Sequence, residues 1–147
     1  MPIGERSRGR RRSSGGSGSA DLVYSTFLGG DGDDYCYDVA LDGGRAYLTG
    51  FTDGVFPTTP GAYNETSTGF YDGFLAVISP SGLGAADFEY GTMFGGTSSE
   101  TPYGIATYSG DAFIAGYTYS SDFPTTPNAY DQTYNGGKDV FVTKVDI

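Results

Sequence analysis

Hydrophobic residues in this chain occur as short runs of β-branched and aromatic residues, bounded by clusters of glycine, aspartate, serine and proline. Such runs are typical of β-strands, and no segment carries the 3.6-residue period of an amphipathic helix. The runs predict eight strands, at about residues 23–28, 35–41, 46–52, 73–79, 88–94, 103–108, 112–118 and 140–146. Glycine-containing turns at 42–45 and 109–111 predict two hairpins, because glycine tolerates the positive φ of tight turns.

The eight predicted strands fall into two copies of one four-strand unit. The segment VYSTFLGG, which ends at Gly30, aligns with EYGTMFGG, which ends at Gly96. The segment FPTTPGAY, which begins at Phe56, aligns with FPTTPNAY, which begins at Phe123, after an insertion near residues 119–122. A repeat of four antiparallel strands is typical of one blade of a β-propeller, and an eight-stranded sandwich is the alternative.

The repeat predicts an all-β chain with two propeller blades, each a four-stranded antiparallel sheet. We expect blade 1 at residues 21–85 and blade 2 at residues 86–147. A propeller closes with about four to eight blades, so two blades leave two sheet faces uncovered. The expected partners are therefore further blades or further copies of the chain, and three or four copies would close a ring.

The amino-acid composition limits the structures and the reactions that the chain can support. The 25 glycines, 13 tyrosines and 10 phenylalanines suit short strands and tight turns. The chain has no histidine and one cysteine, which excludes Ser-His-Asp and Cys-His mechanisms and an intrachain disulfide. No run of about 18 apolar residues occurs, so no transmembrane helix is expected.

Charge is distributed unevenly. Residues 1–20 carry five arginines against one glutamate, and the remaining residues account for a net charge of −14 within the total of −10. An acidic body repels phosphate backbones, so nucleic-acid binding by the folded part is not expected. Residues 1–20 are predicted to be a disordered, basic, Ser/Gly-rich tail, with an arginine-rich nucleic-acid arm as the alternative.

The repeated motifs resemble a known family. Both copies are similar to the SBBP-type (seven-bladed) β-propeller repeat, through YSTFLGG ending at Gly30, YDVA ending at Ala40, AYLTGFT ending at Thr52 and FPTTPGAY ending at Tyr63. Asp122 precedes the second FPTTP motif as the family pattern requires, whereas Val55 precedes the first. The resemblance implies a propeller fold in an extracellular or cell-surface protein, and it implies no shared reaction. The chain itself shows no readable signal peptide.

One acidic cluster is a candidate metal site. Carboxylates on a glycine-containing loop supply the hard oxygen ligands that Ca²⁺ prefers. The loop departs from an EF-hand, and a solvated acidic turn is the alternative interpretation. The candidate ligands are Asp31, Asp33, Asp34 and Asp38.

Tyrosines in or near the long loops are candidate contacts for a carbohydrate or protein ligand, because tyrosine combines a flat apolar ring with a polar tip. They are Tyr63, Tyr71, Tyr119, Tyr130 and Tyr134. Proline and phenylalanine in the two FPTTP motifs are expected to be structural, as stiff anchored connections. These residues are Phe56, Pro57, Pro60, Phe123, Pro124 and Pro127.

Asp72 and Asp139 precede the last strand of each copy, where paired carboxylates could suggest glycosidase chemistry. Their repetition at equivalent sites instead favours a capping or hydrogen-bonding role. We therefore expect no enzymatic activity and no catalytic residue. The function favoured by the sequence is a structural, self-assembling scaffold; a ligand-binding, adhesin-like module is the alternative, and a fragment of a hydrolase is the third class.

Overall fold

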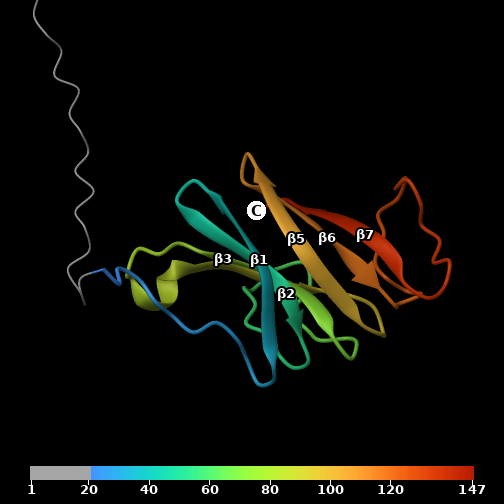
Figure 1. Cartoon of the computed structure of the whole chain (residues 1–147), viewed down its shortest axis with the longest axis horizontal. Helices are drawn as coiled ribbons and strands as arrows, with labels where there is room; N and C mark the ends of the chain where they lie inside the picture. Colours follow the sequence, from blue (N-terminus) through green and yellow to red (C-terminus); the bar gives the residue numbers. More distant parts are fainter. Residues whose placement is uncertain (1–20) are drawn as a thin grey trace, which may run out of the picture.

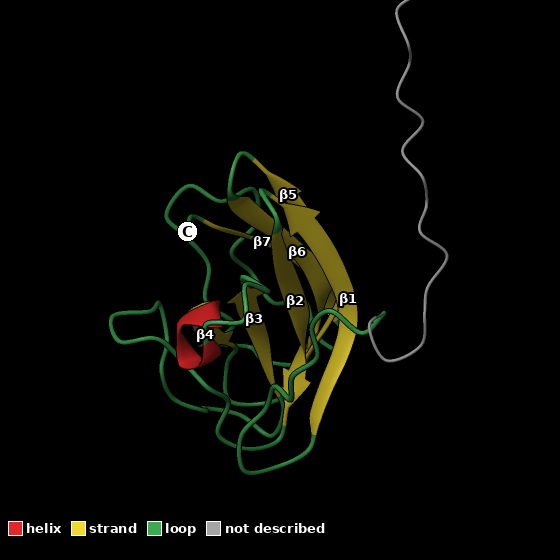
Figure 2. Ribbon diagram, turned by 90° about the vertical axis from the view of Figure 1, so that its left-hand side faces the viewer, coloured by secondary structure: helices red, strands yellow, loops and turns green. Residues whose placement is uncertain are grey.

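The computed structural model describes residues 21–147, so the predicted tail at residues 1–20 lies outside the described part. The described residues are all-β, as predicted, and their seven strands form two antiparallel sheets packed against each other (Figure 1, Figure 2). The sheets have four and three strands and do not close into a ring.

The first sheet has the order β1-β2-β3-β4. Its strands are β1 (Asp34–Asp42), β2 (Arg45–Thr52), β3 (Asp72–Ile78) and β4 (Phe88–Phe94). The predicted hairpin joins β1 to β2, and Gly43 and Gly44 have φ angles of 57° and 81°. A 3-10 turn, η2 (Gly84–Asp87), leads from β3 into β4.

The second sheet has the order β5-β6-β7. Its strands are β5 (Glu100–Tyr108), β6 (Asp111–Thr118) and β7 (Asp139–Val145). Ser109 and Gly110, with φ angles of 55° and 93°, form the second predicted hairpin turn.

The prediction of two four-stranded sheets, one per sequence copy, is wrong in its strand assignment. Residues 23–28 are not a strand, and β4, which belongs to the second sequence copy, pairs with β3 of the first. The first sheet therefore extends to Phe94, past the copy boundary at residues 85 and 86. A strand-forming run becomes a strand only where a neighbouring backbone bonds to it, and in the described chain residues 23–28 have no such neighbour.

The main core lies between the two sheets. Tyr47, Leu75 and Val77 of the first sheet pack there against Ile114 and Phe141 of the second. A smaller cluster on the opposite face of the first sheet contains Phe56, Phe74, Ala76 and Met93, with Leu28, Leu48 and Phe88 packed against it. Both faces of β3 are consequently buried along its whole length.

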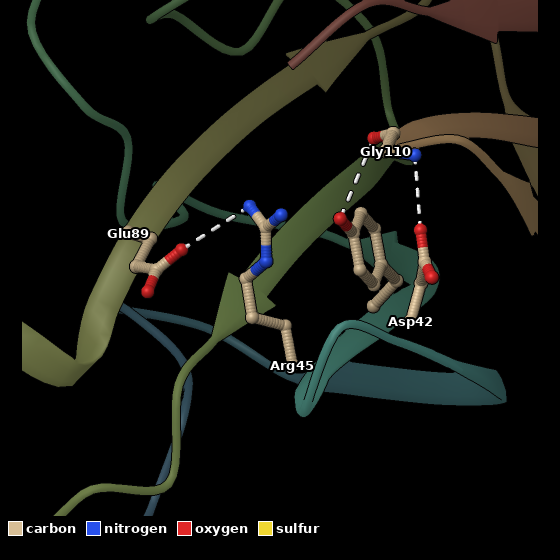
Figure 3. A network of polar contacts seen from close by, with 5 residues as sticks. Asp42, Arg45, Glu89 and Gly110 are labelled. Carbon is tan, nitrogen blue, oxygen red and sulfur yellow. Dashed lines mark hydrogen bonds and ion pairs between the residues drawn. The ribbon is translucent and has the colours of Figure 1, made fainter.

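Polar contacts also join the sheets. The Gly110 N–H donates to Asp42 Oδ2 at 2.9 Å, and the Tyr47 hydroxyl donates to the Gly110 carbonyl at 3.4 Å. Figure 3 shows the bond from Gly110 to Asp42 beside the Arg45–Glu89 ion pair, which links β2 to β4 at 3.4 Å. The two bonds of Gly110 tie the β5–β6 turn to the first sheet.

The two FPTTP motifs are anchored in the same way. Phe56 is 1% exposed and stacks on Phe74, with ring centroids 4.0 Å apart, and Phe123 stacks on Phe141 at 4.8 Å. The stacked rings of Phe56 and Phe123 place both connections against their sheets, and the stiffening role of the prolines stays a prediction.

Candidate functional site

The far face of the second sheet is more exposed than the equivalent face of the first sheet. Val142 occupies in the second copy the position that Leu75 occupies in the first, and Phe113 occupies the position of Tyr47. Leu75 and Tyr47 are fully buried between the sheets, whereas Val142 is 74% exposed and Phe113 is 37% exposed. We call Phe113, Ala115 and Val142 the open face. Residues at these positions are buried in the first sheet because the second sheet covers them, and no described element covers the open face.

The free edge of β7 adjoins the open face. In the first sheet β3 pairs with β2 on one side and β4 on the other, while β7, the equivalent of β3, pairs only with β6 in the described chain. An unpaired strand edge presents backbone N–H and C=O groups to which another strand can bond. The second sheet therefore has one strand fewer than the first and an open edge where that strand would lie.

A groove of about 700 Å³ runs along this edge, between β7 and the loop that precedes it. Its lining includes Thr126, Tyr130 and Asp131 from the loop, together with Val140 and Val142 from β7. Tyr134 also lines the groove. Two of the tyrosines predicted to contact a ligand, Tyr130 and Tyr134, thus lie together here.

A second surface feature is a row of aromatic rings that crosses from the first sheet to the second. Neighbouring ring centroids are between 4.8 and 5.7 Å apart. The Lys138 ammonium lies 4.1 Å from the centroid of the Tyr117 ring. We call this row the aromatic strip; its members are Tyr35, Tyr37, Phe51, Tyr71, Tyr103, Tyr117 and Tyr119.

The aromatic strip collects only part of the predicted tyrosine set. Tyr71 and Tyr119 belong to it, whereas Tyr63 is 64% exposed and makes no ring contact with the strip among the described residues. Tyr37 and Tyr103, which touch across the two sheets at 5.2 Å, were not predicted. Tyr37 and Tyr103 occupy equivalent positions in the two copies, and this repetition could have identified them from the sequence.

Of the four acidic residues predicted as calcium ligands, Asp34 and Asp38 bond to backbone groups through their carboxylates. Asp34 Oδ2 accepts from the Gly30 N–H at 2.8 Å, and Asp38 Oδ2 accepts from the Ile105 N–H of the second sheet at 2.9 Å. The Asp33 N–H donates to Asp53 Oδ1 at 2.7 Å. Within residues 21–147 no three carboxylate or thiol side chains come together as a metal site. Calcium binding by Asp31, Asp33, Asp34 and Asp38 stays a prediction.

Two buried carboxylates meet near Gly95, where the first sheet ends. Asp72 accepts hydrogen bonds from Ser67, Thr68 and Gly69, which matches the capping role expected for it. Glu100 accepts from Thr118 and from the Gly96 N–H. Burial raises the pKa of the Glu100 carboxyl above its ordinary value, and the Asp72 carboxylate raises it further.

Asp34 occupies the position of Glu100 in the first copy, and its Oδ1 is buried without a hydrogen-bond partner in the described chain. The aspartate side chain is one methylene shorter than glutamate. The bond that Glu100 makes to Thr118 is consequently not reproduced between Asp34 and Thr52, the equivalent pair.

No helix of the described residues could cross a bilayer. Comparison with known proteins finds no matching family model and no matching curated protein, so the repeat, the open face and the aromatic strip carry the functional argument.

Proposed function

We propose that the chain is a non-enzymatic structural module that assembles with further copies of itself through the uncovered side of its second sheet, as blades of a propeller-like ring. The single observation that carries the proposal is the pair Leu75 and Val142, equivalent residues that are 0% and 74% exposed. The resemblance to propeller repeats supports an extracellular or cell-surface setting for such a scaffold.

Packing energetics support assembly. Apolar surface removed from water contributes about 25 cal/mol per Å², so an exposed copy of a core face favours association. The contact between the two sheets of one chain supplies a template for it, because Tyr47 and Leu75 pack against Ile114 and Phe141. With two sheets per chain, a closed ring of about four to eight sheets contains two to four copies.

Composition supports the absence of enzymatic activity in this proposal. The whole chain lacks histidine, the commonest general base. The buried carboxylates of Asp72 and Glu100 are engaged by hydroxyl and backbone donors rather than directed toward the groove beside β7. Both carboxylates thus have a structural explanation.

Light scattering on the purified chain over a range of concentrations, followed by electron microscopy, tests the proposal. We expect rings or filaments for the parent chain and monomers for Val142→Asp. The matched control is Val55→Asp, which places the same charge on a valine that is 60% exposed but lies outside the open face. A parent chain that stays monomeric at every concentration, or equal dissociation in both variants, would contradict the proposal.

The aromatic strip favours a second candidate function, a contact surface for a carbohydrate or protein ligand. Its rings are arranged in one continuous row and several are well exposed, with Tyr37 at 47% and Tyr103 at 53%. Flat aromatic faces stack on apolar ligand surfaces while the hydroxyls bond at the rim. Calorimetric titration with a panel of oligosaccharides tests this: Tyr103→Ala should abolish binding and Tyr63→Ala should retain it. Equal binding by both variants would remove the strip from consideration.

A further inference from the structure

The first sheet shows how a fourth strand is held. β4 lies between β3 and the loop that follows Phe56, and it bonds to both. The Thr59 N–H donates to the Gly91 carbonyl at 3.0 Å, and the Met93 N–H donates to the Asn64 carbonyl at 3.0 Å. The loop and β3 therefore form a slot whose occupant is bonded along both of its edges.

The second sheet has the same slot without an occupant among the described residues. The groove beside β7 is lined by Thr126 and Asp131, which are the equivalents of Thr59 and Asn64 in the second copy. β7 supplies the other wall, as β3 does in the first sheet. The groove is thus the position of a β4-like strand, with the equivalent backbone groups on both sides.

The chain contains one segment whose sequence matches this slot. Residues 22–28 are equivalent to residues 88–94, which form β4. Phe27 is 104% exposed, whereas its equivalent in β4, Met93, is fully buried in the cluster of Phe56 and Phe74. The segment therefore exposes the large apolar residue that β4 buries.

Residues 22–28 are already covered on one side by their own chain. Leu28 packs against the Phe56–Phe74 cluster, and the Tyr24 hydroxyl bonds to the buried carboxylate of Asp87. Tyr24 and Leu28 are partly buried, while Val23, Ser25 and Phe27 are exposed. In an extended segment Tyr24 and Leu28 lie on one side and the exposed Val23, Ser25 and Phe27 on the other, although Leu22 and Thr26, which share the side of Tyr24, are exposed as well.

Residues 22–28 lie far from β7 of the same chain. Figure 1 shows the segment, in blue, at the opposite end of the molecule from β7, in red. An occupant of the groove that keeps its contacts to Phe56 and Asp87 must therefore come from another molecule. The surface that carries residues 22–28 also carries the smaller core cluster, which would face the open face of that molecule.

We propose that residues 22–28 of one copy add antiparallel to the free edge of β7 in a second copy and complete its second sheet as the fourth strand. This inference rests on the proposed function and names the contact through which assembly occurs. The β3–β4 register, transferred by the repeat, sets Leu28 opposite Val140, Phe27 opposite Phe141, and Ser25 opposite Thr143.

The transferred contacts are specific. Phe27 enters beside Phe123 and Phe141, as Met93 does beside Phe56 and Phe74. Its N–H donates to the Asp131 carbonyl, and the Ser25 carbonyl accepts from the Thr126 N–H, by analogy with the bonds of β4 to its loop. Main-chain bonds supply affinity and the buried side chain supplies register, as in other cases of strand addition.

At two positions of the proposed contact, the second sheet has a different type of residue from the first sheet. Lys144 stands where the first sheet has Val77, and its ammonium pairs with Asp111 at 2.6 Å. Its aliphatic stem can cover the Tyr24 ring while the charge stays in water. Gly104 replaces Asp38, so the bond that Asp38 makes between the sheets is absent between copies. Association therefore depends on the strand and the open face.

The contact is heterologous, because each copy offers a strand at one end and an edge at the other. Successive additions produce a ring where the rotation closes and a filament where it does not. Every β7 edge inside such an assembly is paired, which removes the exposed edge that a lone chain presents.

Cysteine cross-linking tests the register. In a Cys36→Ser background, one batch carries Ser25→Cys and another carries Thr143→Cys. Under mild oxidation we expect disulfide-linked dimers when the two batches are mixed, with a linked 25–143 peptide detected by mass spectrometry. The matched control mixes Ser25→Cys with Ala106→Cys, an exposed site on β5, two strands away from β7. Equal cross-linking of the control pair would overturn the inference.

A second measurement does not depend on disulfide geometry. Phe27→Asp should weaken association by about 100-fold, from the burial of one phenylalanine. Tyr63→Asp should leave it unchanged, because Tyr63 is 64% exposed and lies outside both residues 22–28 and the open face. Assembly that survives Phe27→Asp and lacks the 25–143 link but is lost with Val142→Asp would overturn the strand addition and keep the proposed function. A parent chain that is always monomeric would overturn both.

Discussion

Phe56 offers the sharpest test of how the long connections are held. Its side chain is 1% exposed, and its ring stacks on Phe74 at a centroid distance of 4.0 Å with 13° between the planes. Replacing Phe56 with alanine removes the ring from the smaller cluster and leaves a cavity beside Ala76 and Met93. The backbone of the connection is untouched, so the loss reports the anchor alone.

The size of the effect follows from burial. A fully buried phenylalanine replaced by alanine costs about 4 kcal/mol, a figure that includes the cavity. The close stacking on Phe74 contributes about 1 kcal/mol of this through the ring pair. Because domains unfold with about 5 to 15 kcal/mol, Phe56→Ala should leave the first sheet only weakly stable.

Phe123 is the matched control, because it has the same place in the second copy and is only partly buried. Its ring lies 4.8 Å from that of Phe141. Phe123→Ala should therefore cost roughly half as much, about 2 kcal/mol. Urea denaturation followed by far-ultraviolet circular dichroism, in the Val142→Asp background that keeps chains apart, measures both losses.

A loss below about 1 kcal/mol for Phe56→Ala would be too small for a buried ring and would refute the anchoring role of Phe56. A larger loss for Phe123→Ala than for Phe56→Ala would equally contradict it. The first result would mean that the prolines, rather than the buried rings, hold the two connections.

Two further predictions concern the packing between strands. Burial raises the pKa of the Glu100 carboxyl in the folded state, so the stabilising effect of Glu100 is greatest at low pH and declines as pH rises from about 4.5 through the raised pKa. Unfolding free energies measured from pH 4 to 8 should therefore change in favour of Glu100→Gln relative to the parent chain as pH rises. A difference between the two chains that does not vary with pH would contradict this prediction. Gly50→Ala places a Cβ 1.7 Å from the Tyr35 carbonyl oxygen and should prevent stable folding. Gly44→Ala, at a φ of 81° with open space around it, should lower the free energy of unfolding by only about 1 kcal/mol in the same denaturation assay. Equal losses of stability in the two variants would show that β1 and β2 lie further apart than in this structure.

Much of the secondary structure follows from local sequence. The runs at 35–41, 46–52 and 112–118 became strands, and the turns at Gly43–Gly44 and Ser109–Gly110 became hairpins. The FPTTP motifs predicted anchored connections because they combine proline with a large ring, and both rings are stacked on a phenylalanine. Local propensity and turn chemistry are sufficient for these features, since neighbouring residues along the chain supply them.

The candidate sites depended on contacts between residues far apart in the sequence. Tyr37 and Tyr103 come from different copies, and only the packing of β1 beside β5 brings their rings together. The acidic residues near Asp31 looked like a metal cluster in sequence, yet Asp38 bonds to the backbone of the other sheet. A loop side chain can bond to several kinds of partner, and the tertiary structure determines which of these partners lie within reach.

The repeat by itself predicted an all-β chain, which the described residues confirm, and showed that one sequence unit occurs twice. Only the tertiary structure decided which strand belongs to which sheet. Residues 23–28 and 89–94 have equivalent sequences, but the first has no described strand beside it and the second lies in the fourth strand of the first sheet. The physical reason is that a strand is defined by hydrogen bonds to a neighbouring backbone, and no local pattern specifies that neighbour.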